Sequence, residues 1–341
     1  MKELSDFSLL GHNPFGIDVR CRHFVEFATV GEACEVARSL HAGQQPFLII
    51  GGGSNLLLTA DYEGTVVHSS IRGIEPALQA DGTVLLRVGS GEVWDDVVAL
   101  CVEHGWYGAE NLSLIPGEVG ASAVQNIGAY GVEASHIIYK VEAVEIATGK
   151  RVVIDATDCD YGYRHSRFKD EWKNRFLITH VVYKLSTVFD PRLDYGNIRD
   201  VLRQRSTVDG QCPTATELRQ AIIDIRREKL PDPAVEGNAG SFFMNPVVER
   251  STFEQLLKKY PQMPHYHVDE HREKIPAGWL IEQCGWKGRS LGRAGVHSRQ
   301  ALVLVNRGGA SGTDIVALSD AIRASVLERF GINIIPEVNI V

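Results

Sequence analysis

The 341-residue sequence has no run of 18 apolar residues, so it predicts no membrane-spanning helix. Its N-terminus also lacks a positive segment followed by an apolar one, and we expect no signal peptide. The six cysteines are far apart and form no C-x-x-C pair. This spacing argues against a zinc finger and favours reduced thiols in a reducing compartment, the cytoplasm.

Other classes of protein are excluded by charge and by missing clusters. A formal net charge of −8 argues against a general nucleic-acid binder, which would be basic. No group of histidine, cysteine, aspartate or glutamate has metal-ligand spacing, so we expect no catalytic metal. The length allows two or three domains, and the composition is ordinary for a globular protein.

Apolar spacing indicates a mixed α and β chain. Helices are expected to begin near residues 33, 93, 214, 251, 277 and 313. Strands are expected near residues 46–50, 64–67, 84–88, 141–147, 151–154, 175–185 and 301–306. Thr214 and Glu217 form a capping-box pattern, and Ser251 and Thr313 are the expected caps of two later helices.

A glycine turn follows the expected strand at residues 46–50 and reads Gly51-Gly52-Gly53-Ser54-Asn55. Bare backbone N–H groups can approach an anion closely, so this turn is a candidate phosphate site. It is not a Walker A loop, and another strand follows too soon for the crossover helix of a Rossmann fingerprint. A plain hairpin turn is the alternative.

Small side chains also dominate residues 115–131. No helical or strand period persists there, so we expect an irregular loop. A loop this long is unusual in a compact domain unless it lies against something. A flat ring and a diphosphate would explain the missing side chains, and a purely structural loop is the alternative.

Three polar residues occur in distinctive surroundings. Ser241 lies within Gly-Asn-Ala-Gly-Ser-Phe-Phe-Met-Asn-Pro at residues 237–246, near apolar, water-poor surface. A glycine-rich turn with a structural serine is the alternative. Arg164 lies in an aromatic, polar loop at residues 161–168, where arginines are usually solvated. Glu337 lies in an apolar C-terminal strand, and a carboxylate there needs an edge position or a partner.

These motifs together resemble the UDP-N-acetylenolpyruvoylglucosamine reductase family, over nearly the whole chain from Asn13 to Val338. The matching segments are Lys-Leu-Pro-Asp-Pro at residues 229–233, the run at residues 237–246, Gly-Tyr-Arg at residues 162–164 and Pro-Glu-Val at residues 336–338. The resemblance implies an α+β protein with the non-Rossmann FAD-binding fold of the vanillyl-alcohol oxidase/PCMH type. It is to the form of the family with a mobile tyrosine-bearing loop. Ala121 departs from the family's usual second glycine or serine, a small change.

The resemblance implies three parts of the chain. Residues 1–70 are expected to form a first FAD-binding subdomain, to which the C-terminal strand at residues 331–341 returns. Residues 71–229 are expected to form a second FAD-binding subdomain, and residues 230–330 a substrate-binding domain.

The implied reaction carries hydride from NADPH through FAD to the enolpyruvyl ether of UDP-N-acetylglucosamine, which gives UDP-N-acetylmuramate for peptidoglycan synthesis. FAD is expected to be non-covalent, because no histidine or cysteine lies in an attachment motif. We expect a monomer in the cytoplasm that inserts into no membrane and binds no nucleic acid. A flavin oxidase of the same fold and a non-catalytic UDP-sugar-binding protein are the alternatives.

The resemblance also implies roles for individual residues. Arg164 matches the arginine that meets the substrate carboxylate, Glu337 would help only as a protonated donor, and Ser241 would deliver a proton. The expected cofactor contacts are Gly51, Gly52, Gly53, Ser54, Asn55, Ile115, Pro116, Gly117, Gly120, Ala121, Val124, Ile127, Gly128 and Arg226. The expected substrate contacts are Tyr130, Tyr195 as the lid residue, Lys229, Asn245, Tyr266, Lys287 and Gln300. For His297, a structural role is the expectation.

Overall fold

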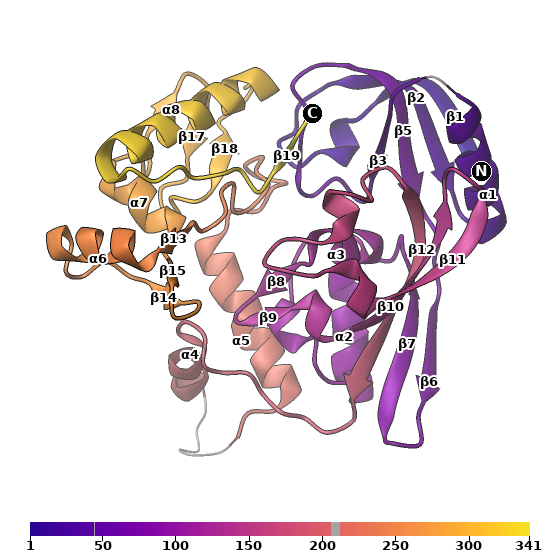
Figure 1. Ribbon diagram of the computed structural model, residues 1–341, viewed down its shortest axis with the longest axis horizontal. Helices are drawn as coiled ribbons and strands as arrows, with labels where there is room; N and C mark the ends of the chain where they lie inside the picture. The colour runs from indigo at the N-terminus through magenta and orange to yellow at the C-terminus, as the bar shows by residue number, and fades with distance from the viewer. Residues whose placement is uncertain (44, 206–211) are drawn as a thin grey trace. The chain divides into compact units, whose positions relative to one another are not determined.

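The computed structural model describes residues 1–43, 45–205 and 212–341 (Figure 1). They divide into two compact units. The first contains residues 1–7, 20–53 and 62–226, and the second contains residues 8–19, 54–61 and 227–341. A subdivision of the first unit near residue 70 stays a prediction.

The first unit contains a four-stranded sheet in the order β1 (Lys2–Ser8), β2 (Arg20–Phe27), β5 (Tyr62–Ser69) and β3 (Phe47–Ile50). β5 runs parallel to both β2 and β3. Parallel strands need a crossover, and α1 (Val30–Ala42) supplies it between β2 and β3. Thr29 caps α1 and Gly43 ends it, which confirms the predicted helix.

A five-stranded antiparallel sheet also belongs to the first unit (Figure 1). Its order is β11 (Lys150–Asp155), β10 (Ile138–Glu145), β12 (Phe176–Ser186), β7 (Thr83–Gly89) and β6 (Ile74–Leu78). The predicted hairpin at residues 141–154 is therefore confirmed. α2 (Trp94–His104) and α3 (Val119–Gln125) contribute to the buried core beside this sheet.

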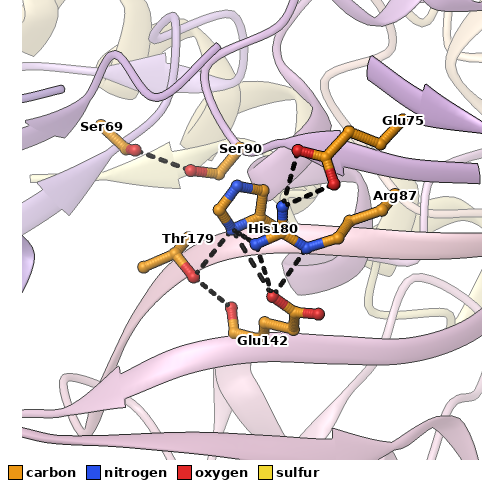
Figure 2. Close-up of polar contacts among 7 residues, drawn as sticks. All are labelled: Ser69, Glu75, Arg87, Ser90, Glu142, Thr179 and His180. Carbon is orange, nitrogen blue, oxygen red and sulfur yellow. Dashed lines mark hydrogen bonds and ion pairs between the residues drawn. The ribbon is translucent and has the colours of Figure 1, made fainter. Parts of the chain in front are cut away.

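Charged side chains join four strands of this sheet (Figure 2). Arg87 on β7 contacts Glu142 on β10 at 2.8 Å and Glu75 on β6 at 3.2 Å. It also approaches Nδ1 of His180 on β12 at 3.0 Å. Opposite charges on neighbouring strands favour one register. The network therefore supports the pairing that orders these strands.

Short elements and two helices complete the first unit. α5 (Ala215–Lys229) begins in this unit with the predicted capping box, because Thr214 accepts from the Glu217 N–H and donates to its carboxylate. The remaining elements are α4 (Ile198–Arg205), β8 (Gly128–Ala129), β9 (Val132–Glu133), and the 3₁₀ helices Glu110–Leu112, Ala134–His136, Ala156–Cys159 and Arg167–Lys169.

The second unit is built from short strands and helices. α8 (Gly312–Phe330) packs on the sheet of β16 (Ser290–Leu291), β17 (Ala294–Val296) and β18 (Leu304–Asn306) (Figure 1). α6 (Arg250–Lys259) packs beside β13 (Val247–Glu249) and β15 (Arg272–Lys274), and β14 (Tyr266–His267) completes their three-stranded sheet. α7 (Ala277–Gln283), the 3₁₀ helix Leu10–His12, and the parallel pair β4 (Leu56–Leu57) and β19 (Asn339–Ile340) complete it.

Several local predictions were wrong. The C-terminal strand expected at residues 331–341 is limited to β19, so Glu337 lies outside a strand. Residues 119–125 of the expected loop at residues 115–131 are helical, because α3 begins after Glu118 and its small residues allow close packing. α6 is capped at Glu249 rather than Ser251. The N-cap of α8 is Ser311, whose hydroxyl accepts from the Asp314 N–H, so Thr313 lies inside the helix.

Over the described ranges 1–43, 45–205 and 212–341, no helix is long and apolar enough to cross a membrane.

Candidate active site

The glycine turn of the first unit follows directly from β3. Gly53 has a φ of +76°, a conformation that favours glycine. Gly52 is exposed, and a Cβ at Gly51 would meet Ala121 and Glu118 at 3.3 and 3.4 Å. The backbone at Gly52 is therefore reachable by an anion, and Gly51 is half-buried beside it, which fits a diphosphate.

Residues 115–131, which we call the small-residue segment, pack closely against the turn at Ser90. The Gly120 N–H donates to the Ser90 carbonyl at 2.8 Å, and a Cβ at Gly120 would lie 3.0 Å from the Ser90 Cβ. Gly117 has a φ of +117° and accepts from the Trp94 N–H. Close packing at Gly120 and the positive φ at Gly117 thus explain these two glycines without a ligand. Other expected contacts in this segment are an exposed Pro116 and the half-buried Ile115, Ala121, Val124 and Ile127.

Arg164 reaches the C-terminal end of this segment. Its guanidinium donates to the carbonyls of Gly128 and Asn126. A Cβ at Gly128 would lie 2.7 Å from Nη1 of Arg164, so only glycine admits the guanidinium there. Arg164 itself has a φ of +56°, a strained conformation for a residue with a side chain.

A second arginine lies within electrostatic range of Arg164. Arg226 on α5 donates from Nε to the Leu114 carbonyl at 3.2 Å and bonds the Tyr130 hydroxyl. Burial lowers the pKa of Arg226 below its ordinary value. The charge of Arg164 adds to this lowering, and Tyr130 opposes it. The charge of Arg164 thus acts on the buried Arg226, and an anion placed near both cations would be stabilised.

The lid candidate Tyr195 lies against this arginine site. Its ring meets Tyr130 edge-on, with centroids 6.4 Å apart. A Cβ at Gly131 would lie 3.4 Å from the Tyr195 Cβ. Asn111, which is buried, donates to the carbonyls of Tyr130 and Arg192 at 3.0 and 2.9 Å. The segment before Tyr195 is therefore fixed to the turn that carries Tyr130.

A partly buried ion pair supports the start of the small-residue segment. Asp95 contacts Arg219 at 2.6 Å and accepts from the Leu114 N–H, and Leu114 has a φ of +57°. Burial alone would raise the pKa of Asp95, but Arg219 and this N–H lower it below its ordinary value. The stability from this ionised carboxylate is present above its unfolded pKa and is lost as pH falls through the lower folded value.

Asp95→Ala is expected to destabilise the protein by about 3 kcal/mol, because it leaves Arg219 without its carboxylate in a partly buried site. Denaturant unfolding followed by circular dichroism measures this loss. Asp96→Ala, at the exposed next position, is the matched control and should change stability little. Equal denaturation midpoints for the two variants would contradict a stabilising role of the Asp95–Arg219 ion pair.

The second unit holds Ser241 in a fixed backbone. Asn238, which is 1% exposed, accepts from the Gly240 N–H at 2.9 Å and donates to the carbonyls of Pro231 and Glu236. Ser241 is half-buried and bridges Val303, and the buried Phe242 and Phe243 follow it. The glycine turn continues into isolated bridges at Ser241 and Phe243 rather than into a strand.

Glu337 lies next to this stretch. Its N–H donates to the Phe242 carbonyl at 2.8 Å, and Phe243 bridges Pro336. Its carbonyl accepts from Nδ2 of Asn55 at 3.1 Å. The structure thus brings Ser241, Glu337 and Asn55 together, although they are far apart in the sequence. Ser54, which precedes Asn55 and is another expected cofactor contact, is half-buried.

Some expected substrate contacts of the second unit already have partners. Asn245 accepts from the Ala277 N–H at 2.9 Å and so caps α7. Nζ of Lys287 contacts Glu282 at 2.9 Å. Gln300 accepts from the Leu302 N–H at 3.3 Å, while Lys229 is exposed and Tyr266 is 39% exposed. Their roles toward a ligand stay predictions.

The sequence did not reveal two buried asparagines that position the first unit's site. Asn126 ends α3 with a φ of +46° and donates to the carbonyl of Gly162 at 2.7 Å and to Glu133 at 2.8 Å. This contact fixes the loop that carries Arg164. The left-handed position was a detectable signal, because asparagine is enriched there. Asn111, described above, has no such local signal.

The sequence prediction for His297 was a structural role. His297 is buried, and its Nδ1 accepts from the Arg299 N–H at 3.3 Å. Burial lowers the pKa of His297 below its ordinary value. A neutral histidine that satisfies a backbone N–H fits that prediction.

Two family models match parts of the chain. One described as "FAD binding domain" matches residues 21–155. The other, described as "UDP-N-acetylenolpyruvoylglucosamine reductase, C-terminal domain", matches residues 232–341. The first range includes the glycine turn and the small-residue segment, and the second includes Ser241 and Glu337.

Whole-length relatives have the same description. A UDP-N-acetylenolpyruvoylglucosamine reductase of Bacteroides fragilis (strain YCH46) is 56% identical over 335 residues, which cover 98% of this chain and 99% of the relative. One of Paraburkholderia phymatum is 46% identical over 333 residues, 97% of this chain and 95% of the relative.

A solved structure shares the fold. The crystal structure of UDP-N-acetylenolpyruvylglucosamine reductase from Thermus caldophilus matches with a TM-score of 0.66 and 21% identity, over 99% of this chain and 98% of that chain. The fold class predicted from the sequence, an α+β protein with a non-Rossmann FAD-binding fold, is confirmed.

Proposed function

Because the chain belongs to the UDP-N-acetylenolpyruvoylglucosamine reductase family, we propose that it reduces UDP-N-acetylglucosamine enolpyruvate to UDP-N-acetylmuramate with electrons from NADPH. The chain is an FAD-dependent oxidoreductase of peptidoglycan precursor synthesis. The observation that carries the proposed site is the guanidinium of Arg164, which is held on the Gly128 and Asn126 carbonyls with the charge of Arg226 within electrostatic range and suits a carboxylate or phosphate.

The residues present fit FAD. The exposed Gly52 and the half-buried Gly51 offer backbone that suits its diphosphate, and the half-buried apolar residues of the 115–127 segment suit a flat ring. When bound, FAD supplies hydride transfer, and the protein supplies placement and electrostatics. The other proposed cofactor contacts are those named from the sequence.

Arg164 would stabilise charge that develops on the substrate. Hydride addition to the terminal carbon of the enolpyruvyl group leaves negative charge on the adjacent carbon, and this charge delocalises into the carboxylate. A guanidinium held on the Gly128 carbonyl is oriented before the reaction begins. Preorganised donors of this kind lower the barrier where charge develops.

Ser241 would then donate its hydroxyl proton to that carbon. A serine hydroxyl is a weak acid, but a carbanion-like enolate is a strong base, so the transfer is feasible. The apolar flanks Phe242 and Phe243 limit competing water. Glu337 would assist as a protonated hydrogen-bond donor, because a second anion would repel the developing charge.

The proposal also covers the contacts to the UDP-sugar, the oligomeric state and the cellular location. Tyr130, Tyr195, Lys229, Asn245, Tyr266, Lys287 and Gln300 are the proposed contacts to the UDP-sugar. Lys287 would have to exchange its contact with Glu282 for a phosphate. We also propose that the enzyme works as a cytoplasmic monomer.

An absorption spectrum of the purified protein tests the proposal. We expect bound flavin, bleaching by NADPH, and recovery of the oxidised spectrum when the UDP-enolpyruvyl sugar is added without oxygen. Rapid recovery in air without the sugar would favour an oxidase instead. A colourless protein that takes up no FAD would contradict both readings.

A further inference from the structure

His68 at the end of β5 lies between two carboxylates. Its Nδ1 is 3.0 Å from Glu26 on β2, and its Nε2 is 3.1 Å from both carboxylate oxygens of Glu118. The imidazole is 7% exposed, and the Glu118 side chain is 12% exposed. The Phe24 ring stacks near it at a centroid distance of 6.3 Å. A buried charge requires such partners.

Glu118 lies against the glycine turn. A Cβ at Gly51 would be 3.4 Å from its Oε2, and one at Gly52 would be 3.6 Å from its Oε1. Glu118 is also the residue before α3, so its side chain touches one glycine-rich segment while its backbone begins the other. His68 pairs with Ile50, the residue before Gly51. The histidine is therefore tied to both segments proposed to hold FAD.

The residue after His68 strengthens the same connection. The Ser69 hydroxyl bonds the Ser90 hydroxyl at 2.6 Å (Figure 2). The Ser90 carbonyl accepts the Gly120 N–H in the first turn of α3. Two consecutive side chains of β5 thus fix the start of α3 beside the glycine turn.

The negative charge of Glu118 disfavours a diphosphate at the glycine turn, and a positive charge on His68 offsets it. A carboxylate in contact with a turn that receives a diphosphate would repel it. Burial alone would lower the pKa of His68, but the hydrogen bonds and charges of Glu118, and then of Glu26, outweigh it and raise that pKa above its ordinary value. A protonated imidazole offsets the nearest anion and donates to both carboxylates at once.

We propose that His68 is a positioning residue for FAD binding, which holds the Glu118 carboxylate against Gly51 and Gly52 and balances its charge. This inference rests on the proposed placement of the FAD diphosphate at the glycine turn. His68 has no part in the proposed hydride or proton transfers.

His68→Gln is expected to weaken FAD binding by about tenfold or more, because glutamine is uncharged and leaves both carboxylates uncompensated near the diphosphate. The measurement is titration of apoprotein with FAD, followed by flavin fluorescence, with circular dichroism to verify folding. His23→Gln, on the exposed face of β2, is the matched control and should bind FAD as the wild type does.

Two further readouts separate charge balance from simple packing. In the wild type, FAD affinity should fall as pH rises through the raised pKa of His68, because the cation is lost, and His68→Gln should abolish this step. The double variant His68→Gln/Glu118→Gln should recover most of the affinity. Glu118→Gln alone should bind FAD at least as tightly as the wild type, with a flatter pH profile, and this holds as a test even if His68→Gln does not fold.

Wild-type affinity and pH dependence in His68→Gln would overturn the inference. So would a loss that Glu118→Gln does not relieve, since that pattern indicates packing alone. Gly52→Asp tests the placement of the diphosphate separately. If it weakens FAD binding while His68→Gln does not, only the inference fails. If it binds FAD normally, the glycine turn is not the diphosphate site, and both fail.

Discussion

Replacing Ser241 by alanine is expected to lower kcat by about 10²–10⁴-fold, the usual contribution of a positioned proton donor. Binding of FAD and its reduction by NADPH should stay unchanged, because only the delivery of a proton to the substrate carbon is lost. The backbone of Ser241 is fixed by its bridge to Val303 and by the Phe242 N–H bond to the Leu302 carbonyl. Loss of one hydroxyl should therefore leave the fold intact.

Stopped-flow absorbance separates the two half-reactions. NADPH should bleach the flavin of Ser241→Ala at the wild-type rate, and the UDP-enolpyruvyl sugar should restore the colour slowly. Ser251→Ala, on the exposed first turn of α6, is the matched control and should turn over normally. Fast recovery in Ser241→Ala would show that the proton comes from another group.

Local patterns were sufficient to predict much of the fold. Thr214 and Glu217 satisfy each other's backbone within four residues, so the capping box needed no tertiary information. β2 was missed for a physical reason. Its buried residues are Cys21, Phe24 and Phe27, and a register irregularity between Cys21 and His23 breaks the expected alternation.

The helix α3 was missed because it has little apolar periodicity. Its sequence is Val-Gly-Ala-Ser-Ala-Val-Gln, and glycine is a poor helix former. Close packing of Gly120 on Ser90 favours the helix instead, and that contact is visible only in three dimensions. The small residues of this segment can be explained by a bound ligand or by close packing. The sequence alone suggested the ligand, and the packing became visible only in the structure.

The candidate site shows the same limit. The motif around Arg164 was recognised from the sequence. The hydrogen bond from its guanidinium to the Gly128 carbonyl could not be, because the two residues are 36 positions apart. His68 gave no signal, because its partners Glu26 and Glu118 are 42 and 50 positions away. Groups that touch a ligand often occur in motifs, whereas those that support them come from distant strands.

Arg164→Lys is expected to lower kcat and kcat/KM together, by about 10²–10³-fold, because the lost interaction is made mainly where charge develops. Arginine holds two carbonyls, those of Gly128 and Asn126, with its planar guanidinium, and still presents donors. A lysine ammonium is a single point charge on a flexible stem and cannot reproduce that geometry. FAD binding should be unaffected.

The matched control is Arg167→Lys in the same loop, whose guanidinium contacts Glu171 at 3.5 Å and the Asp158 carbonyl at 3.0 Å. It should keep wild-type turnover and similar thermal stability. Steady-state kinetics over a range of UDP-sugar concentrations distinguishes the possible outcomes for Arg164→Lys. A rise in KM with unchanged kcat would mean that Arg164 binds the ground state and transition state equally, which would remove it from the chemical step.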